Sequence, residues 1–277
     1  MKIMSNATGS RLRSDLLSAQ NSELRTETGF TLAELAIVLI VITLLVAGLL
    51  VPLTAQIQLR QISDTQKTLE QAREALIGFA ISQGRLPCPA APGTNGKENP
   101  INGGDCPNAL NGFLPAITLG ITPTDNQGYL MDAWGNRIRY AVDKTTINDP
   151  LGIPINSPFT STNGMKTVTM ANIVKPSSGS FLNICSSSTG ITANDCGVNP
   201  GTTTIADKIP AVIYSLGKNG ATATTMADEL ANTDGDRIFV SHETTTDPVT
   251  KREFDDLVVW VSLNTLFNRM VTAGQLP

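Results

Sequence analysis

Histidine is almost absent from this chain of 277 residues, because His242 is the only one. A catalytic triad or a metal centre built on histidine would therefore depend on a single side chain. The sequence also lacks a G-x-S-x-G elbow, a P-loop and an H-E-x-x-H motif. His242 lies in a strand-like pattern that is typical of an exposed strand residue. These absences predict a protein that is not an enzyme and has no catalytic residues.

Charge is also scarce, since charged residues make up 16% of the chain and form no long run of one sign. The net charge is −4, and no basic patch is visible of the kind that neutralises phosphates. We therefore expect no nucleic acid among the partners. Aromatic residues make up only 5%, whereas Gly, Pro, Ser, Thr and Asn are frequent after residue 84. This composition favours loops and short strands over a helical bundle.

One long apolar run is present near the N-terminus. Every position in 35–51 is apolar or small except Thr43. At about 1.5 Å per residue the run gives roughly 25 Å of helix, which is at the short end of a membrane span. Basic residues outnumber acidic residues in the polar segment before the run, which favours a topology with the N-terminus inside.

The helix is expected to continue beyond Pro52, which should kink it rather than end it. Apolar residues recur at intervals of three and four within 53–84, with polar residues between them. This pattern is typical of an amphipathic helix with one face to bury. Gly84 and Pro87 then form a stop signal. The sequence predicts one kinked helix over residues 30–83.

Short segments rich in β-branched residues follow, separated by Gly, Pro, Asn and Asp. They are 136–143, 166–174, 210–217, 236–243 and 255–262, with a short terminal helix at 263–274. No crossover helices alternate with these strands, so the sheet should be antiparallel. The expected fold class is α+β: a long kinked N-terminal helix, membrane-spanning in its first half, packed on an antiparallel sheet with disulfide-stapled loops.

The segment "GFTLAELAIVLIVITLLVAGLLVP" resembles the prepilin signal of type IV pilins and of type II secretion pseudopilins. That family has Gly before the cleavage site, Phe after it, and Glu as the fifth residue of the mature chain. Gly29, Phe30 and Glu34 occupy these places. The resemblance implies that a prepilin peptidase cuts between Gly29 and Phe30 and then methylates the new amine of Phe30.

Three regions follow from this resemblance. They are a cleaved leader at 1–29, an N-terminal transmembrane and amphipathic helix at 30–83, and a periplasmic or extracellular pilin-like domain at 84–277. The implied location is the bacterial inner membrane, single-pass, with entry into an extracellular filament as a further possibility. An ordinary secretory signal cut near Ala55 is the alternative. However, Leu53 occupies the −3 position, where such a signal requires a small residue.

Glu34 raises a physical question, since an unpaired carboxylate inside a bilayer costs several kcal/mol. Cleavage creates a second charge, the ammonium of Phe30. In a helical array, Glu34 of one subunit could pair with that ammonium on a neighbour and so set the register. The alternative is a glutamate that lies at the interface without a partner.

Weaker resemblances lie in the C-terminal region. "DAWGNRIRY" at 132–140 and "YSLGKNG" at 214–220 resemble segments of pseudopilins. "GRLPCPA" at 84–90, together with the first of these, resembles large prepilin-like proteins of proteobacteria. The resemblance implies a structural subunit, a minor pilin or pseudopilin, of a type IV pilus or a type II secretion pseudopilus. The alternatives are a pilus-tip adhesin and a membrane-tethered periplasmic enzyme.

The partners implied are other pilin or pseudopilin subunits, the prepilin peptidase, an inner-membrane assembly platform and membrane lipid. The four cysteines all follow the apolar run, and an exported domain would pair them. Three connectivities are possible. Local pairing needs the least chain reorganisation, so we expect Cys88–Cys106 and Cys185–Cys196.

Calcium is the one cofactor that the sequence raises. Asp234 and Asp236 flank Gly235 in an oxygen-rich segment, and Asp255 and Asp256 follow. Such turns can hold Ca²⁺, and some pseudopilins bind calcium after the Ser-Leu-Gly segment. Full EF-hand spacing is missing, and an ordinary solvated turn is the alternative. No other cofactor is expected.

Overall fold

The structure, a computed structural model, describes residues 29–276 except 169, 174–175, 179–180, 198–201, 222–225, 249 and 251. The side chains of 48–53, 170 and 176–178 also lie outside the described part. The chain divides into two compact units, Met1–Leu53 and Thr54–Pro277. The expected leader falls almost entirely on residues that the structure does not describe.

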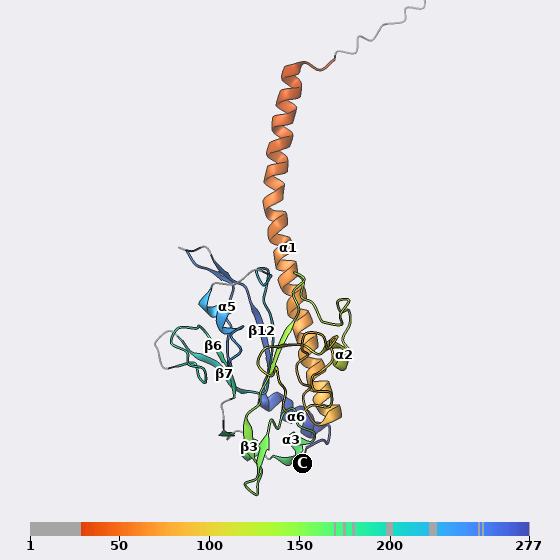
Figure 1. Cartoon of the computed structure of the whole chain (residues 1–277). Helices are drawn as coiled ribbons and strands as arrows, with labels where there is room; N and C mark the ends of the chain where they lie inside the picture. Colours follow the sequence, from red (N-terminus) through yellow and green to blue (C-terminus); the bar gives the residue numbers. More distant parts are fainter. Residues whose placement is uncertain are drawn as a thin grey trace, which may run out of the picture. The chain divides into compact units, whose positions relative to one another are not determined.

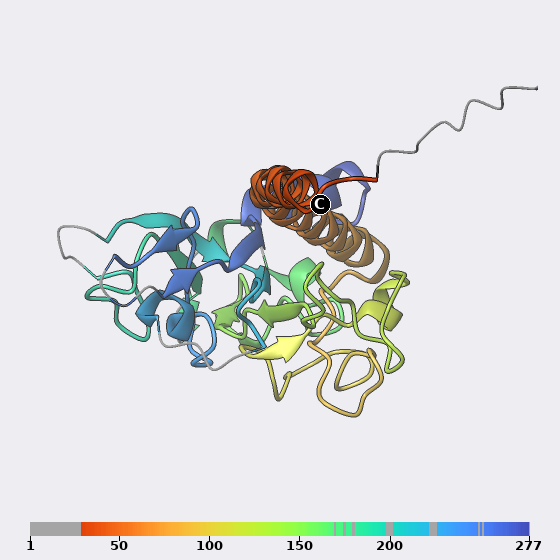
Figure 2. The same cartoon turned by 90° about the horizontal axis from the view of Figure 1, so that it is seen from above.

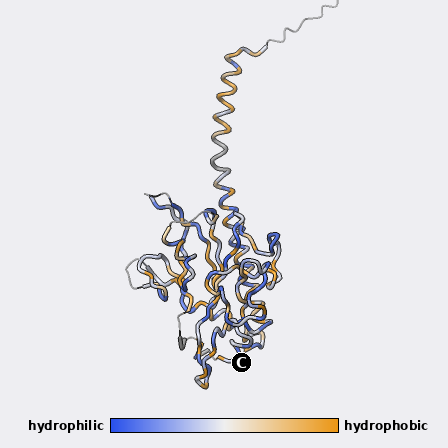
Figure 3. Tube along the Cα trace, viewed as in Figure 1, coloured by the Kyte–Doolittle hydropathy of each residue, from blue (hydrophilic) through white to orange (hydrophobic). Residues whose placement is uncertain are grey.

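Helix α1 is the longest element and spans Leu32–Gln83 (Figure 1). Its first part, in the Met1–Leu53 unit, is strongly apolar (Figure 3). The helical assignment continues across Pro52, but the side chain there is outside the described part, so the expected kink is not described. The helix ends at Gln83 because Gly84 adopts a left-handed φ of 70°, a conformation that favours glycine.

The expected membrane span is wrong as far as the structure describes the chain. Within the helical residues whose side chains are described, no helix combines the length and the apolar character needed to cross a membrane. A span needs about 20 consecutive apolar residues, and the expected run at 35–51 extends into side chains outside the described part. Neither the membrane-spanning first half of the helix nor the single-pass inner-membrane location is supported.

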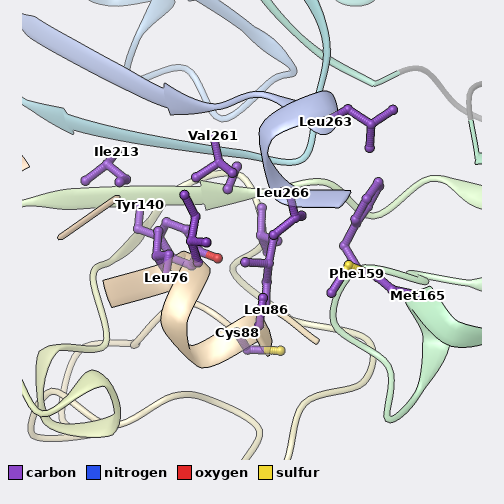
Figure 4. Close-up of a cluster of buried hydrophobic side chains, with 14 of the residues drawn as sticks. Leu76, Leu86, Cys88, Tyr140, Phe159, Met165, Ile213, Val261, Leu263 and Leu266 are labelled. Atoms are coloured by element: carbon purple, nitrogen blue, oxygen red, sulfur yellow. The ribbon is translucent and has the colours of Figure 1, made fainter. Parts of the chain in front are cut away.

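The second unit is built on a four-stranded antiparallel sheet in the order β1-β2-β8-β12. Its strands are Gly112–Phe113, Arg139–Val142, Ala211–Ser215 and Leu257–Val261. One face packs on the amphipathic part of α1 and on α6, Leu263–Thr272. Figure 4 shows this contact, with Leu76 from α1 and Leu266 from α6 facing Tyr140, Ile213 and Val261 of the sheet.

A second sheet, β7-β6-β9, covers the opposite face (Figure 2). Its strands are Thr204–Ile209, Leu182–Cys185 and Ile238–Val240, and the β6–β9 pair is parallel. Leu182, Ile184 and Phe239 pack there against Val212 and Tyr214 of β8. The four-stranded sheet is therefore buried on both faces, which explains why all five residues of β8 are buried.

Smaller elements complete the second unit. The β4-β3-β5 sheet has strands Pro154–Asn156, Thr146–Asn148 and Pro176–Ser178, and β10 and β11 pair Thr245–Thr246 with Glu253–Phe254. The short helices are α2, Ala116–Leu119; α3, Gly164–Thr167; α4, Met170–Ile173; and α5, Ala227–Ala231.

The fold class expected from the sequence is therefore wrong in its sheet as well as in its membrane span. The chain is α+β, but among the residues that the structure describes the strands form four sheets rather than one, and one strand pair is parallel. The strand expected at 166–174 is also wrong, because α3 and α4 occupy this segment. Thr167 donates its hydroxyl to the carbonyl of Gly164, a local bond that competes with strand pairing.

Both expected disulfides are present, Cys88–Cys106 and Cys185–Cys196. The first lies in the long loop after α1, where Arg85 and Glu98 form a buried bidentate ion pair at 2.7 and 2.8 Å. Glu98 also accepts from the N–H of Cys88 at 3.1 Å. Covalent and ionic links together fix a loop that has little secondary structure.

Candidate functional site

The first candidate site is the start of α1, where Thr31 and Glu34 form a capping box. The N–H and the hydroxyl of Thr31 both donate to the Glu34 carboxylate, at 2.8 and 2.9 Å. In return the N–H of Glu34 donates to the Thr31 hydroxyl at 3.2 Å. Each residue satisfies backbone N–H groups that a helix start leaves unpaired. The hydrogen bonds from the N–H and the hydroxyl of Thr31 lower the pKa of Glu34.

Apolar side chains surround the helix immediately after this cap. Every residue from position 29 to position 47 is exposed in the structure. The large apolar side chains among them are Phe30, Leu32, Leu35, Ile37, Val38, Leu39, Ile40, Val41, Ile42, Leu44, Leu45 and Val46. A helix that is apolar on all sides is normally buried, so this surface needs a covering partner.

The second candidate site lies where the two weaker sequence resemblances meet. Ser215 donates its hydroxyl to Oδ2 of Asp132 at 2.6 Å. Asn136 donates its side-chain amide to the carbonyl of Gly217 at 2.6 Å. The segments 132–140 and 214–220 are therefore joined directly, although more than seventy residues separate them. This junction fixes the turn that follows β8.

That turn leads into a cluster of three carboxylates, Glu229, Asp255 and Asp256, from which one oxygen each lies within 4.8 Å of the others. All three residues are buried. Lys218 donates its N–H to Oδ2 of Asp255 at 2.9 Å, and Asn219 donates its side-chain amide to Glu229 at 2.7 Å. Helix α5 supplies Glu229, whereas the link between β11 and β12 supplies the other two.

Gly217 is required for this packing. It adopts a left-handed φ of 64°, and a Cβ placed there would lie 2.2 Å from Oδ1 of Asp255. That oxygen is buried and has no hydrogen-bond partner among the described residues. A buried acceptor without a partner is costly, so Oδ1 of Asp255 destabilises the fold unless a proton or a ligand satisfies it.

Electrostatics in the cluster favour neutral or cation-bound carboxyl groups. Burial raises the pKa of Asp255 to about 6 and that of Asp256 to about 8. Burial also raises the pKa of Glu229, and the neighbouring carboxylates add to each effect. Hard oxygen ligands of this kind suit a divalent cation such as Ca²⁺. The residues present therefore fit the cation that the sequence raised.

The structure does not bring Asp234 and Asp236 into this cluster. Oδ1 of Asp234 accepts from the N–H of Asp236 at 3.0 Å, and Oδ1 of Asp236 accepts from the N–H of Ile238 at 2.7 Å. Both side chains therefore close turns before β9. The sequence shows Glu229 only as one of several acidic residues between Tyr214 and Asp256. It was not selected as a ligand, because nothing in the segment "ADELAN" distinguishes it from a residue on an exposed helical turn.

His242 is partly buried, and both of its ring nitrogens are engaged. Nε2 lies 3.0 Å from Oδ2 of Asp228, and Nδ1 lies 2.7 Å from the carbonyl of Glu243. The ring stacks on Phe254 at a centroid distance of 3.8 Å. These contacts link the β9–β10 loop to α5 and β11.

The chain matches no family model, no curated protein and no solved structure.

Proposed function

We propose that this chain is a structural subunit of a filament of the type IV pilin or pseudopilin kind. In this proposal a prepilin peptidase cuts after Gly29 and methylates Phe30, and an assembly platform polymerises the subunit through its N-terminal helix. The observation that carries the proposal is the exposed apolar helix that directly follows the Gly29-Phe30 pair and Glu34.

The apolar surface supports an assembled state. Side chains exposed on every side of one helix cannot all be covered by a single flat partner. Several copies of the same helix, packed around a common axis, would cover them and would remove a large apolar area from water. This reasoning favours a multi-subunit filament over a monomer or a simple dimer.

Glu34 then has two tasks, to cap its own helix and to pair with a neighbouring subunit. Substitutions in the capping box can separate these two tasks. Glu34 caps its own helix through Thr31, and after cleavage it lies four residues from the ammonium of Phe30. In a filament the same carboxylate would meet that ammonium on a neighbouring subunit. A charge pair covered by apolar helices is strongly favoured over two unpaired charges, so it would select the correct register.

Two substitutions test this division. Glutamine is accepted at the third position of a capping box, so Glu34→Gln retains the cap and removes the charge. Thr31→Val removes the capping hydroxyl and retains the charge. The measurement is incorporation into filaments, by quantitative mass spectrometry of sheared or secreted material, with total subunit level as the control.

We expect Glu34→Gln to reduce incorporation at least tenfold and Thr31→Val to reduce it far less. The opposite order would mean that Glu34 acts only as a helix cap, and the proposed register role would be abandoned. Normal incorporation of both variants would mean that assembly needs neither the charge nor the cap, and the register role would be abandoned. Absence of the wild-type chain from filament material would overturn the filament proposal itself.

A divalent cation at Glu229, Asp255 and Asp256 is a second part of the proposal. It is supported by the buried oxygen of Asp255 that lacks a partner among the described residues. The cation would neutralise three carboxylates and tie α5 to the turn after β8 and to the link between β11 and β12. We expect calcium, and not magnesium at the same concentration, to raise the melting temperature of the chain.

A further inference from the structure

Strand β12 forms an open edge of the four-stranded sheet. It pairs with β8 on one side, and no strand lies on its other side within the described residues. All five residues of β12 pair with β8 in a regular register without a bulge. Its sequence, LVVWV, contains no charge and no proline. An apolar, regular edge strand of this kind presents unpaired N–H and C=O groups to another chain.

Other edges in this protein carry the features that normally prevent such pairing. Strand β7 contains Asp207 and Lys208, its pairing with β6 shifts register, and Lys208 has a positive φ of 54°. Strand β4 is only three residues long and begins with Pro154. Strand β12 has none of these protections, so along its length it is able to pair with another strand.

A groove runs along this edge. Two cavities of about 410 and 370 Å³ both include Val258 and Val259 in their walls, so they adjoin. Helix α1 lines the first cavity with Glu70, Arg73 and Ile77. It lines the second with Ile62, Gln66 and Leu69. The groove therefore follows β12 for its whole length, which is roughly 17 Å for an extended strand of five residues.

The two faces of β12 define what would fit beside it. Leu257 and Val259 pack toward the core that contains α1, whereas Val258 and Trp260 pack toward the core beneath β6 and β9. An added strand would continue this alternation, so its side chains would extend both apolar layers in turn. β-Branched residues suit such positions best.

Polar groups along the groove favour an extended main chain. Nε of Arg73 is buried and has no hydrogen-bond partner among the described residues, although its guanidinium pairs with Glu70 at 2.7 Å. A peptide carbonyl would supply the missing acceptor. At the other end Glu243 is exposed, and it forms no ion pair with any residue that the structure describes. That end favours a basic side chain.

We propose that the edge of β12 binds an extended segment of another protein by strand addition. The segment alternates β-branched side chains and carries a lysine or arginine next to Glu243. Main-chain hydrogen bonds to β12 provide affinity, and the two apolar layers with Glu243 provide specificity. This binding surface is separate from the N-terminal helix, so it does not depend on the filament proposal.

The test uses the purified full chain and a synthetic probe, a peptide that begins with lysine and then alternates valine and threonine. Amide hydrogen exchange of β12 is measured with and without the probe, and affinity is measured by calorimetry. One control peptide carries N-methyl groups on alternate amides, which blocks strand pairing. A second control begins with glutamate. We expect at least tenfold slower exchange in β12 with the probe, and at least tenfold weaker binding of each control.

Val258→Pro and Val259→Pro form a matched pair of variants. Successive N–H groups of a strand point to opposite edges, so one proline removes a bond to β8 and the other removes only an unpaired N–H. The variant that keeps its melting temperature should lose probe binding at least tenfold. Unchanged binding by that variant would overturn the proposal.

Wild-type exchange in β12 that does not respond to millimolar probe would also overturn it. Protection of β12 that rises with protein concentration in the absence of probe would mean that a second copy of this chain occupies the edge. In that case the proposal of another protein as the partner would be overturned.

Discussion

Asp256→Asn should make the chain more stable above neutral pH, because the carboxylate is costly where it lies. Asp256 is buried, and burial raises its pKa from 3.8 to about 8. The side-chain amide of Asn232 donates to Oδ2 of Asp256 at 2.7 Å. An asparagine at this position offers a carbonyl oxygen of the same shape for that bond, so the substitution removes the charge and little else.

The direction of the effect follows from proton linkage. The folded state binds this proton more tightly than the unfolded state does, so the stability from the protonated group is fully present below about pH 4. It is lost as pH rises toward about 8. Within that window the free energy of unfolding falls by up to about 1.4 kcal/mol for each pH unit. Between pH 5 and pH 7 the loss of unfolding free energy from Asp256 is therefore at most roughly 3 kcal/mol.

The assay is chemical denaturation in EDTA at pH 5, 6, 7 and 8, on the wild-type chain and on Asp256→Asn. We expect the wild-type free energy of unfolding to fall across this range by a few kcal/mol, and the variant's to fall by clearly less. Asp236→Asn is the matched control outside the cluster, because Asp236 is a partly buried carboxyl group whose pKa burial raises to about 6. Parallel curves for wild type and Asp256→Asn would refute the reasoning, and so would a wild-type stability that rises with pH.

Two further substitutions test the packing around the sites. Glu98→Gln leaves the guanidinium of Arg85 buried without its counter-charge, so we expect a loss of about 3–5 kcal/mol in denaturant unfolding; a loss below 1 kcal/mol would show that this pair does not fix the loop. Gly217→Ala places a methyl group against Asp255 at a left-handed φ, so we expect a loss of about 1–3 kcal/mol together with a smaller thermal response to calcium; an unchanged calcium response would separate the turn from the cluster.

Much of the second unit could be predicted from local sequence. The apolar spacing in 53–84 and the Gly84 signal indicated the helix and its end, and the terminal helix at 263–272 lies within the predicted segment. The disulfide pairing was also predicted, because pairing of cysteines that are close in the chain needs the least chain reorganisation. These features depend on residues that are close in the chain.

The remaining features depend on contacts between distant segments. Strands β6 and β9 pair in parallel, although over fifty residues separate them, and no local pattern specifies such a partner. Residues 166–174 contain enough β-branched residues to predict a strand. The preceding turn instead leads into α3, which overlaps the start of this segment. Glu229 joins Asp255 and Asp256 only because α5 lies beside the link between β11 and β12, where the N–H of Asp255 donates to Glu229, so the cluster could not be predicted from spacing.

The capping box shows a different limit of sequence reasoning. Threonine followed three residues later by glutamate is a helix-start signature, and it was present at Thr31 and Glu34. The same glutamate also belongs to the pattern that resembles a prepilin signal. Glu34 therefore has a local structural task as well as a proposed assembly task, and each must be tested separately.

The central claim is that the mature chain begins at Phe30 and enters a filament. The most direct measurement is intact-mass and N-terminal peptide mass spectrometry of the protein from its native host, alongside a strain without prepilin peptidase. We expect an N-methylated Phe30 as the first residue in the native host, and the uncut chain in the peptidase-deficient strain. A native chain that retains Met1, or one that begins near Gln56 in both strains, would contradict it.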